Sequence, residues 1–124
     1  MSKQKPVIDF PGETAPTELE IVEEVEGTGA EAKPGDTVAV HYVGVAFSTG
    51  EEFDASYNRG APLQFKLGVG MVIPGWDQGV TGMKVGGRRT LRIPPHLAYG
   101  PNGVPGAIGP NESLIFVCDL EQVG

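Results

Sequence analysis

Two histidines and one cysteine are the side chains of this 124-residue sequence that most often serve as zinc ligands, proton carriers or nucleophiles. They are His41, His96 and Cys118, and their spacing matches none of the usual three- or four-ligand zinc sites. Each histidine is therefore interpreted as an ordinary strand or loop side chain. Cys118 lies in a run of alternating polar and apolar residues, where a cysteine is most often a small buried hydrophobe. The sequence predicts no metal site.

Glycine-containing segments that could hold a phosphate are also present, but the residues around them argue against that chemistry. Residues 27–32 fit the pattern G-x-G-x-x-A, and Lys33-Pro34-Gly35 follows at once. A proline and a glycine there would break the helix whose N-terminus must hold the pyrophosphate. Gly68-Val69-Gly70 has Ile73 where the third small residue should stand, and neither a P-loop nor a G-x-S-x-G motif occurs. We therefore expect no covalent catalysis and no bound cofactor.

The charge balance limits the classes of partner. Nine Lys and Arg residues against 16 Asp and Glu residues give a formal net charge of -7 and a pI near 4.7. Phosphate backbones and anionic membrane surfaces attract proteins of the opposite sign, so we expect neither nucleic acid nor membrane as a partner. A single cysteine excludes a disulfide within the chain.

The N-terminal residues predict an arm outside the domain and a cytoplasmic location. No apolar signal-peptide core follows the first residues, and no stretch approaches the ~18 apolar residues that span a bilayer. Residues 1–16 are rich in proline and show little periodicity, so we expect an extended arm. Its apolar residues Val7, Ile8 and Phe10 are expected to lie across the body of one domain, residues 17–124. Nothing in the sequence suggests more than a monomer.

Most of the chain alternates between polar and apolar residues, which is typical of strands with one buried face. Residues 63–67 and 89–93 alternate strictly, and the last predicted strand is 113–123. Residues 37–47 are rich in valine and predict a long strand, and a turn at Ser48-Thr49-Gly50 leads back into a strand at 51–54. The strand at 113–123 places Leu114, Phe116, Cys118 and Leu120 on one face. Residues 18–26 place Leu19, Ile21 and Val25 on one side, which predicts a half-buried strand. A helix is the alternative there, because glutamate is a good helix former.

One short helix is predicted from about Trp76 to Met83, after the turn Ile73-Pro74-Gly75. Its apolar residues Trp76, Val80 and Met83 are spaced four and three apart, which puts them on one stripe. No strand–helix–strand rhythm appears, so a parallel doubly wound fold is excluded. The pattern predicts an α+β fold in which an antiparallel sheet is covered by one helix.

Residues 36 to 124 resemble the FKBP family of peptidyl-prolyl cis–trans isomerases, through short blocks that occur in family order with near-family spacing. The blocks are Val40-His41-Tyr42-Val43-Gly44, Phe53-Asp54-Ala55-Ser56, Val72 to Val80, Met83 to Gly87, Arg89 to Pro94, Ala98-Tyr99-Gly100 and Leu114-Ile115-Phe116. A single block of this kind would be weak, but the ordered series is highly specific. The resemblance implies a five- to six-stranded antiparallel half-barrel sheet wrapped around one short helix.

The resemblance also implies a function, an isomerase that speeds rotation about X-Pro peptide bonds, and a pocket between helix and sheet. Trp76 would form the floor under the proline ring. The walls and rim would come from Tyr42, Phe53, Leu63, Phe65, Val72, Ile73, Phe116 and, from the flap at residues 100–112, Ile108. The implied partners are proline-containing peptides, folding polypeptides and macrolide inhibitors of the rapamycin type.

Four residues are implied to act at the reacting bond. They are Asp54, Tyr99, Ile73 and Phe53. The Tyr99 hydroxyl and the Ile73 backbone N–H would bind substrate carbonyl groups. Asp54 resembles the family's buried carboxylate, with Tyr42 and Arg59 as its neighbours, and it either faces the twisting amide or holds those neighbours in place.

The sequence departs from the better-known small family members at the rim and the flap. Leu63 stands where an aromatic often closes one wall, and Val104, Ala107 and Gly109 replace larger or more rigid flap residues. These changes bear on substrate preference and macrolide affinity. Two alternatives stay open: a proline-peptide binding module with negligible turnover, and a chaperone-like binder of unfolded chains. The short flap, which has no inserted domain, argues against the second.

Overall fold

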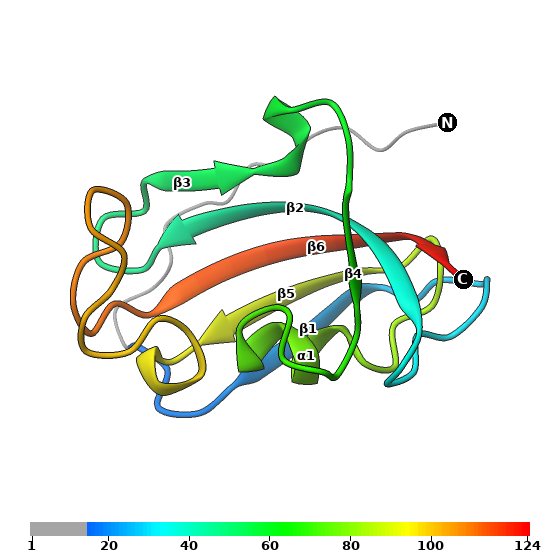
Figure 1. The fold of residues 1–124 in the computed structure, drawn as a ribbon, viewed down its shortest axis with the longest axis horizontal. Helices are drawn as coiled ribbons and strands as arrows, with labels where there is room; N and C mark the ends of the chain where they lie inside the picture. The colour runs from blue at the N-terminus through cyan, green and yellow to red at the C-terminus, as the bar shows by residue number, and fades with distance from the viewer. Residues whose placement is uncertain (1–14) are drawn as a thin grey trace.

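A computed structural model describes residues 15–124, in which one antiparallel sheet curves around a single α-helix (Figure 1). The predicted fold class, α+β with a sheet wrapped around one short helix, is confirmed. The expectation for Val7, Ile8 and Phe10 concerns residues outside the described part of the chain. Within residues 15–124, no helix is long and apolar enough to cross a membrane.

The sheet contains six strands, all paired antiparallel. They are β1 (Glu20–Val25), β2 (Thr37–Ala46), β3 (Glu52–Ala55), β4 (Leu63–Lys66), β5 (Arg88–Ile93) and β6 (Leu114–Val123). Their order is β1-β5-β6-β2-β3, and β4 also pairs with β2. Every predicted strand is present with only its end residues shifted, and the helix alternative for residues 18–26 is wrong.

Strand β2 is long enough to pair with two short strands along one of its edges. Its C-terminal half pairs with β3, where Gly44 lies opposite Asp54, and its N-terminal half pairs with β4, where Val40 lies opposite Leu63. Its other edge pairs with β6. β3 and β4 therefore lie one after the other along the same edge of β2, at one border of the concave face.

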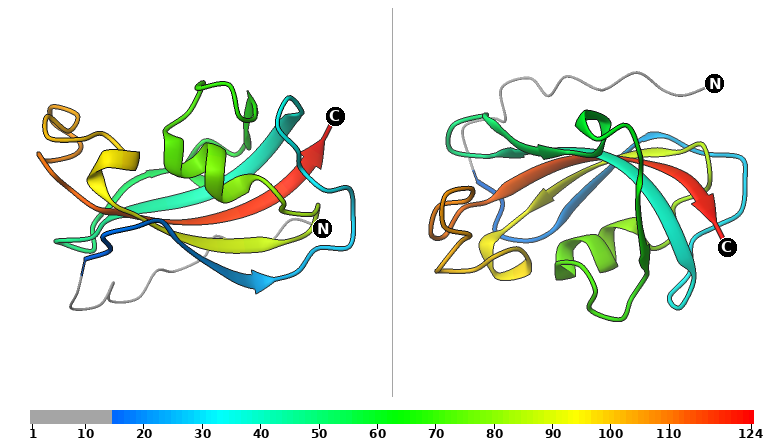
Figure 2. Two further views of the ribbon diagram at one scale, coloured as in Figure 1. Left: turned by 90° about the horizontal axis from the view of Figure 1, so that it is seen from below. Right: turned by 45° about the horizontal axis from the view of Figure 1, so that its top comes forward.

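Helix α1 (Pro74–Val80) lies against the concave face of the sheet (Figure 2). It begins two residues before the predicted start at Trp76, because a proline fits the first turn, where its missing N–H has no intrahelical acceptor to lose. It ends at Val80 rather than at Met83, because Thr81 has an extended backbone with ψ of 128°. Met83 is still buried in the core.

Two glycines on α1 allow the helix to approach β5 closely. A methyl group built on Gly75 would lie 2.6 Å from Ile93, and one built on Gly79 would lie 2.7 Å from Leu91. Because these glycines are four residues apart, they share one face of the helix. The close approach places Trp76, between them, over the centre of the concave face.

The main core fills the space between α1 and the concave face. It contains the predicted face of β6, which is Leu114, Phe116, Cys118 and Leu120. The prediction that Cys118 is a buried hydrophobe is confirmed, and burial raises the pKa of its thiol. A second, smaller apolar cluster lies on the opposite, convex face and includes Val43, Val45 and Ile115. The centre of the sheet is therefore buried on both faces.

The prediction of a half-buried β1 is wrong, since every residue of that strand is exposed. Ile21 and Val25 are 45% and 47% exposed. β1 is the outer strand next to β5, and it is β5 that the helix contacts, so no helix of residues 15–124 covers the apolar side of β1. Its carboxylates instead reach the arginines of β5, as in the pair Glu20–Arg92 at 3.3 Å.

A buried carboxylate, Asp119 of β6, lies on the convex face. The Arg88 side chain of β5, opposite it in register, donates to it from Nε at 2.6 Å and Nη2 at 3.0 Å. The Tyr57 hydroxyl donates to the same carboxylate at 2.5 Å, and its ring stacks on His41. Burial and the bond to Asp119 raise the pKa of Tyr57, so its hydroxyl stays a donor. The buried Asp119 carboxylate is thus stabilised by hydrogen bonds from Arg88 and Tyr57 in place of water.

Candidate active site

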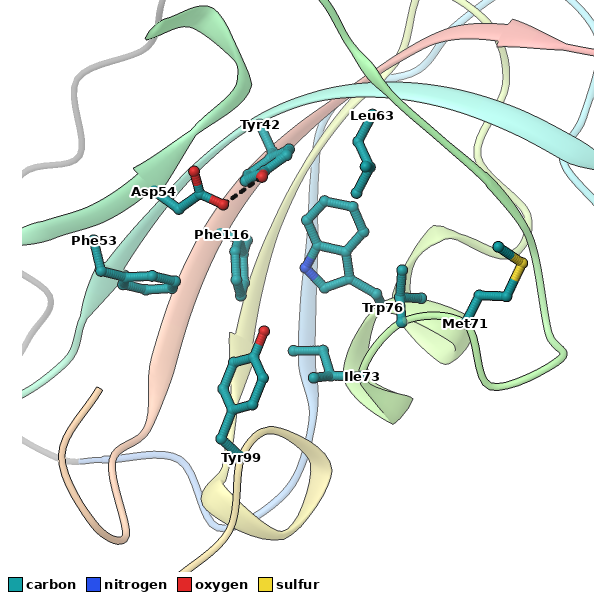
Figure 3. Close-up of a pocket in the computed structure, with 10 residues that line it drawn as sticks. Tyr42, Phe53, Asp54, Leu63, Met71, Ile73, Trp76, Tyr99 and Phe116 are labelled. Atoms are coloured by element: carbon teal, nitrogen blue, oxygen red, sulfur yellow. Dashed lines mark hydrogen bonds between the residues drawn. The ribbon is translucent and has the colours of Figure 1, made fainter. Parts of the chain in front are cut away.

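A cleft of about 160 Å³ opens between the start of α1 and the concave face of the sheet (Figure 3). Its lining is mostly aromatic and aliphatic, with one carboxylate. The residues are Tyr42, Phe53, Asp54, Leu63, Met71, Val72, Ile73, Trp76, Tyr99 and Phe116. A mostly apolar concave site with a few polar groups is the usual form of a small-ligand pocket.

The floor of the cleft is the indole of Trp76, which is 3% exposed. The rings of Tyr42 and Phe116 meet it nearly edge to face, with centroids 4.9 Å and 5.2 Å away and interplanar angles of 83° and 88°. The indole Nε1 has no hydrogen-bond partner among the described residues, and Figure 3 shows that edge of the indole turned toward the Phe116 ring. A weak N–H···π contact is the interaction that this geometry offers. Packing of the two rings against the indole therefore fixes the orientation of Trp76 in the floor of the cleft.

The wall opposite α1 depends on the absence of a side chain at Gly44. The rings of Phe53 and Phe116 meet edge to face in front of this glycine, with centroids 5.5 Å apart. A methyl group at Gly44 would lie 2.8 Å from Phe53 Cζ and 2.9 Å from Phe116 Cδ1. Glycine at this position of β2 therefore lets both rings lie against the strand and leaves the cleft open.

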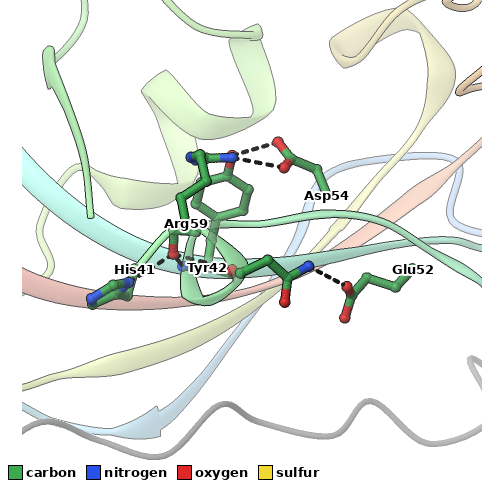
Figure 4. Close-up of polar contacts among 7 residues, drawn as sticks. His41, Tyr42, Glu52, Asp54 and Arg59 are labelled. Atoms are coloured by element: carbon green, nitrogen blue, oxygen red, sulfur yellow. Dashed lines mark hydrogen bonds and ion pairs between the residues drawn. The ribbon is translucent and has the colours of Figure 1, made fainter. Parts of the chain in front are cut away.

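One end of the cleft is closed by a hydrogen-bonded group of Tyr42, Asp54 and Arg59 (Figure 4). The Tyr42 hydroxyl donates to Asp54 Oδ2 at 2.5 Å, and Arg59 donates to Asp54 Oδ1 and to the Tyr42 oxygen, each at 2.9 Å. The Arg59 guanidinium also lies 5.6 Å from the centre of the Tyr42 ring. Burial, followed by the bond to Asp54, raises the pKa of Tyr42, so its hydroxyl stays protonated. The carboxylate is thereby oriented by two donors while its side chain stays 43% exposed.

Two donors at the other end of the cleft are available to a ligand. The Tyr99 hydroxyl points into the cleft in Figure 3, and within residues 15–124 it has no hydrogen-bond partner. Burial, followed by the charge of Asp54, raises the pKa of Tyr99, so this hydroxyl is also a donor. The backbone N–H of Ile73, just before α1, likewise donates to no group of the described chain. Both are placed to bind carbonyl oxygens.

The structure brings together nine of the residues predicted for the site. Those that line the cleft are Tyr42, Phe53, Asp54, Leu63, Val72, Ile73, Trp76, Tyr99 and Phe116. Arg59 lies behind Asp54 and Tyr42. Phe65 is buried with its ring centroid 5.7 Å from that of Trp76, and Ile108, a residue of the flap, has its side chain buried in the core. These last two therefore support the pocket without lining it.

Met71 also lines the cleft, and the sequence reasoning missed it. It is 63% exposed, and its sulfur accepts a hydrogen bond from the Lys66 backbone at 3.4 Å. The signal in the sequence is slight. A methionine follows two turn glycines, Gly68 and Gly70, directly before the predicted helix. Exposed apolar residues of this kind are common on protein surfaces, so sequence alone does not separate Met71 from them.

The flap at residues 100–112 is anchored at its tip and at its base. At the tip, Val104 and Ile108 exchange two backbone hydrogen bonds of 2.8 Å, and the Ile108 side chain is buried in the core. At the base, Glu112 accepts hydrogen bonds from the Ser48 backbone N–H at 3.1 Å and from its hydroxyl. Ala107 and Gly109, two of the unusual flap residues, are exposed.

Within the described residues, no group of three or more His, Cys, Asp or Glu side chains is arranged to hold a metal ion. The cleft itself offers an apolar lining with oriented hydrogen-bonding groups: Asp54 at one end, and Tyr99 and Ile73 at the other.

Comparison with known proteins gives consistent matches over most of the chain. The family model described as FKBP-type peptidyl-prolyl cis-trans isomerase matches residues 29–121. A "FK506-binding protein" of Streptomyces anulatus is 66% identical over 124 residues, covering 99% of this chain and all of that protein. "Peptidyl-prolyl cis-trans isomerase FPR2" of Saccharomyces cerevisiae is 54% identical, covering 80% of this chain and 73% of that protein. The crystal structure of AtFKBP13 superposes with a TM-score of 0.80 at 43% identity, covering 89% of this chain and 96% of that one.

Proposed function

This chain belongs to the FKBP-type peptidyl-prolyl cis–trans isomerase family, and we propose that it binds the X-Pro bond in the cleft above Trp76 and stabilises the twisted amide there without covalent chemistry. The observation that carries this mechanism is the composition of the cleft. An aromatic floor and walls lie between an oriented carboxylate and two donors that have no partner in residues 15–124.

The apolar lining has a direct chemical use. Rotation about a peptide bond breaks amide resonance against a barrier of about 18–20 kcal/mol, so the uncatalysed X-Pro reaction takes tens to hundreds of seconds. The planar amide is more polar than the twisted one. Water therefore stabilises the ground state more than the transition state, and an apolar cleft removes much of that difference. Stabilising the twisted amide by ~5 kcal/mol would raise the rate several thousandfold.

The polar groups orient the peptide around that bond. The Tyr99 hydroxyl and the Ile73 N–H bind the carbonyl groups on either side, which holds the flanking chain while the amide rotates. The proline ring rests on Trp76, between the side chains of Phe53 and Val72. Asp54, held by Tyr42 and Arg59, faces the amide and favours its twisted charge distribution.

We extend the proposal to partners and location. The substrates are proline-containing peptides and folding polypeptides in the cytoplasm, and the protein acts as a monomer. Macrolides such as FK506 and rapamycin compete for the same cleft, which is supported by the name of the Streptomyces anulatus relative. The aliphatic rim at Leu63 and the small flap residues Ala107 and Gly109 reduce the contact available to such a ligand.

The test is the isomerisation rate of peptides that vary in the residue before proline, with and without rapamycin. We expect the protein to accelerate cis–trans exchange and rapamycin to inhibit it competitively. Acceleration without inhibition would keep the isomerase and reject the macrolide proposal. A folded protein that binds the peptides without accelerating any of them would favour the proline-peptide binding module.

Replacing Asp54 by alanine is expected to lower kcat/KM by about tenfold, since a hydrogen-bonded charge of this kind contributes about 1.4 kcal/mol when it acts in the transition state. KM should change little, because the floor and the carbonyl donors remain. The matched control is Glu52→Ala, an exposed carboxylate on the same strand that does not line the cleft. If the folded Asp54→Ala protein keeps full activity, Asp54 does not take part in catalysis.

A further inference from the structure

Strand β2 has a gap in its pairing directly behind the active-site carboxylate. β3 stops pairing with β2 at Ala55, opposite Val43, and β4 begins to pair with it at Leu63, opposite Val40. Between these points the chain leaves the sheet through a 3-10 turn, Ser56–Asn58. His41 and Tyr42 therefore have no strand partner at this edge, although Tyr42 is a residue of the cleft.

The Ser56 hydroxyl fills this gap. Its oxygen accepts a hydrogen bond from the Tyr42 backbone N–H at 2.6 Å. The same hydroxyl lies 2.8 Å from His41 Nδ1 and 3.3 Å from the Tyr42 carbonyl oxygen, so it has a second partner for either tautomer of the imidazole. Ser56 is 0% exposed, so water cannot replace these bonds without opening the structure. The side chain thus substitutes for a missing strand at Tyr42.

Ser56 is also connected to the other two members of the hydrogen-bonded group. It follows Asp54 by two residues, and its carbonyl oxygen accepts the Arg59 backbone N–H at 3.0 Å. On the opposite face, the Tyr42 hydroxyl meets Asp54 and Arg59. Ser56 is therefore connected to the backbones of Tyr42 and Arg59 by hydrogen bonds and to that of Asp54 through the chain.

We propose that Ser56 is a positioning residue for the isomerase, acting through Asp54. By holding the Tyr42 backbone, it places the Tyr42 hydroxyl, at the far end of a long side chain, where it orients the Asp54 carboxylate. A small shift at the Tyr42 backbone is carried to this hydroxyl, and misplacement of a catalytic group by about 1 Å can cost 100-fold in rate. The inference rests on the proposed function, in which Asp54 faces the reacting amide.

The test is a double-mutant cycle of Ser56→Ala and Asp54→Ala, measured as kcat/KM for one X-Pro peptide. We expect Ser56→Ala alone to lower kcat/KM by about 3- to 10-fold, because it leaves the buried Tyr42 N–H without its acceptor. In the Asp54→Ala background it should change kcat/KM by less than about 1.5-fold, since residues that act as one unit are not additive. An equal loss in both backgrounds overturns the proposal, because a merely structural role does not depend on Asp54.

Tyr57→Phe is the matched control, one residue further along the same 3-10 turn. It removes a hydroxyl that bonds to Asp119 on the convex face, and neither Tyr57 nor Asp119 lines the cleft. We expect it to lower the denaturation midpoint at least as much as Ser56→Ala does while leaving kcat/KM unchanged. A loss of kcat/KM in both variants, in proportion to their loss of stability, would overturn the positioning role.

A spectroscopic readout separates this inference from the proposed function. The ¹³C resonance of the Asp54 carboxylate should move in Ser56→Ala and stay in place in Tyr57→Phe, whether or not the protein turns over peptides. An unmoved resonance overturns the inference, whereas an inactive wild type with the expected shift overturns only the proposed function. If Ser56→Ala does not fold, Ser56→Cys, which keeps a weak acceptor, takes its place in the cycle and in the spectra.

Discussion

Replacing Phe116 by alanine is expected to lower kcat/KM by about 100-fold and the free energy of unfolding by about 3–5 kcal/mol. The side chain is buried at the centre of the cleft, and its ring contacts those of Tyr42, Phe53 and Trp76. Edge-to-face pairs contribute about 0.5–1.5 kcal/mol each beyond the area they bury. Their loss leaves a hole in the wall and frees the Trp76 indole to tilt, so the cleft no longer fits the twisted amide.

Phe65→Ala is the control for this prediction. Phe65 is equally buried and also packs against Trp76, but it does not line the cleft. It should cost a similar free energy of unfolding, measured by urea denaturation, while kcat/KM falls by less than about tenfold. Trp76 is the one tryptophan in the sequence, so its fluorescence reports on the floor in both variants. Equal losses of kcat/KM in the two variants would contradict a specific role for the Phe116 wall.

Replacing Asp119 by alanine is expected to destabilise the fold by about 3–5 kcal/mol, because it removes the buried carboxylate that accepts hydrogen bonds from the Arg88 guanidinium and the Tyr57 hydroxyl. Asp119 is 0% exposed and accepts hydrogen bonds from Arg88 and Tyr57. Its loss also removes a link between β5, β6 and the 3-10 turn that carries Ser56. The measurement is the urea midpoint followed by Trp76 fluorescence, and kcat/KM of the folded fraction should change little.

Glu26→Ala provides the contrast for the buried carboxylate. Glu26 pairs with Lys84 at 3.5 Å, but its side chain is 70% exposed. An exposed pair contributes about 0–1 kcal/mol, so this variant should leave the urea midpoint almost unchanged. A replacement of Asp119 and Arg88 together by apolar residues should recover part of the loss, because the buried carboxylate and its guanidinium partner are then removed together. A small effect of Asp119→Ala alone would show that water reaches Arg88 on the convex face.

The sequence by itself was sufficient for the secondary structure and for much of the pocket. Alternation of polar and apolar residues marks β1, β4 and β5, because successive side chains in a strand point to opposite faces, and a valine-rich run marks β2. The resemblance to the FKBP family, carried by the ordered blocks around Tyr42, Asp54, Trp76 and Tyr99, implies residues that the fold does bring into one cleft. The strand patterns depend only on neighbouring residues, so they can be recognised in the sequence without knowledge of the tertiary contacts.

The tertiary structure decided which faces are covered and which groups meet. β1 alternates like the buried strands, yet it is exposed because the helix contacts its neighbour β5. Phe65 and Phe116 read alike in the sequence, but only the second borders the cleft. Met71 joins the cleft, and Ser56 fills a gap in the sheet, through contacts that no local pattern reports. The physical reason is that periodicity defines the faces of an element, whereas burial and function depend on what packs against each face.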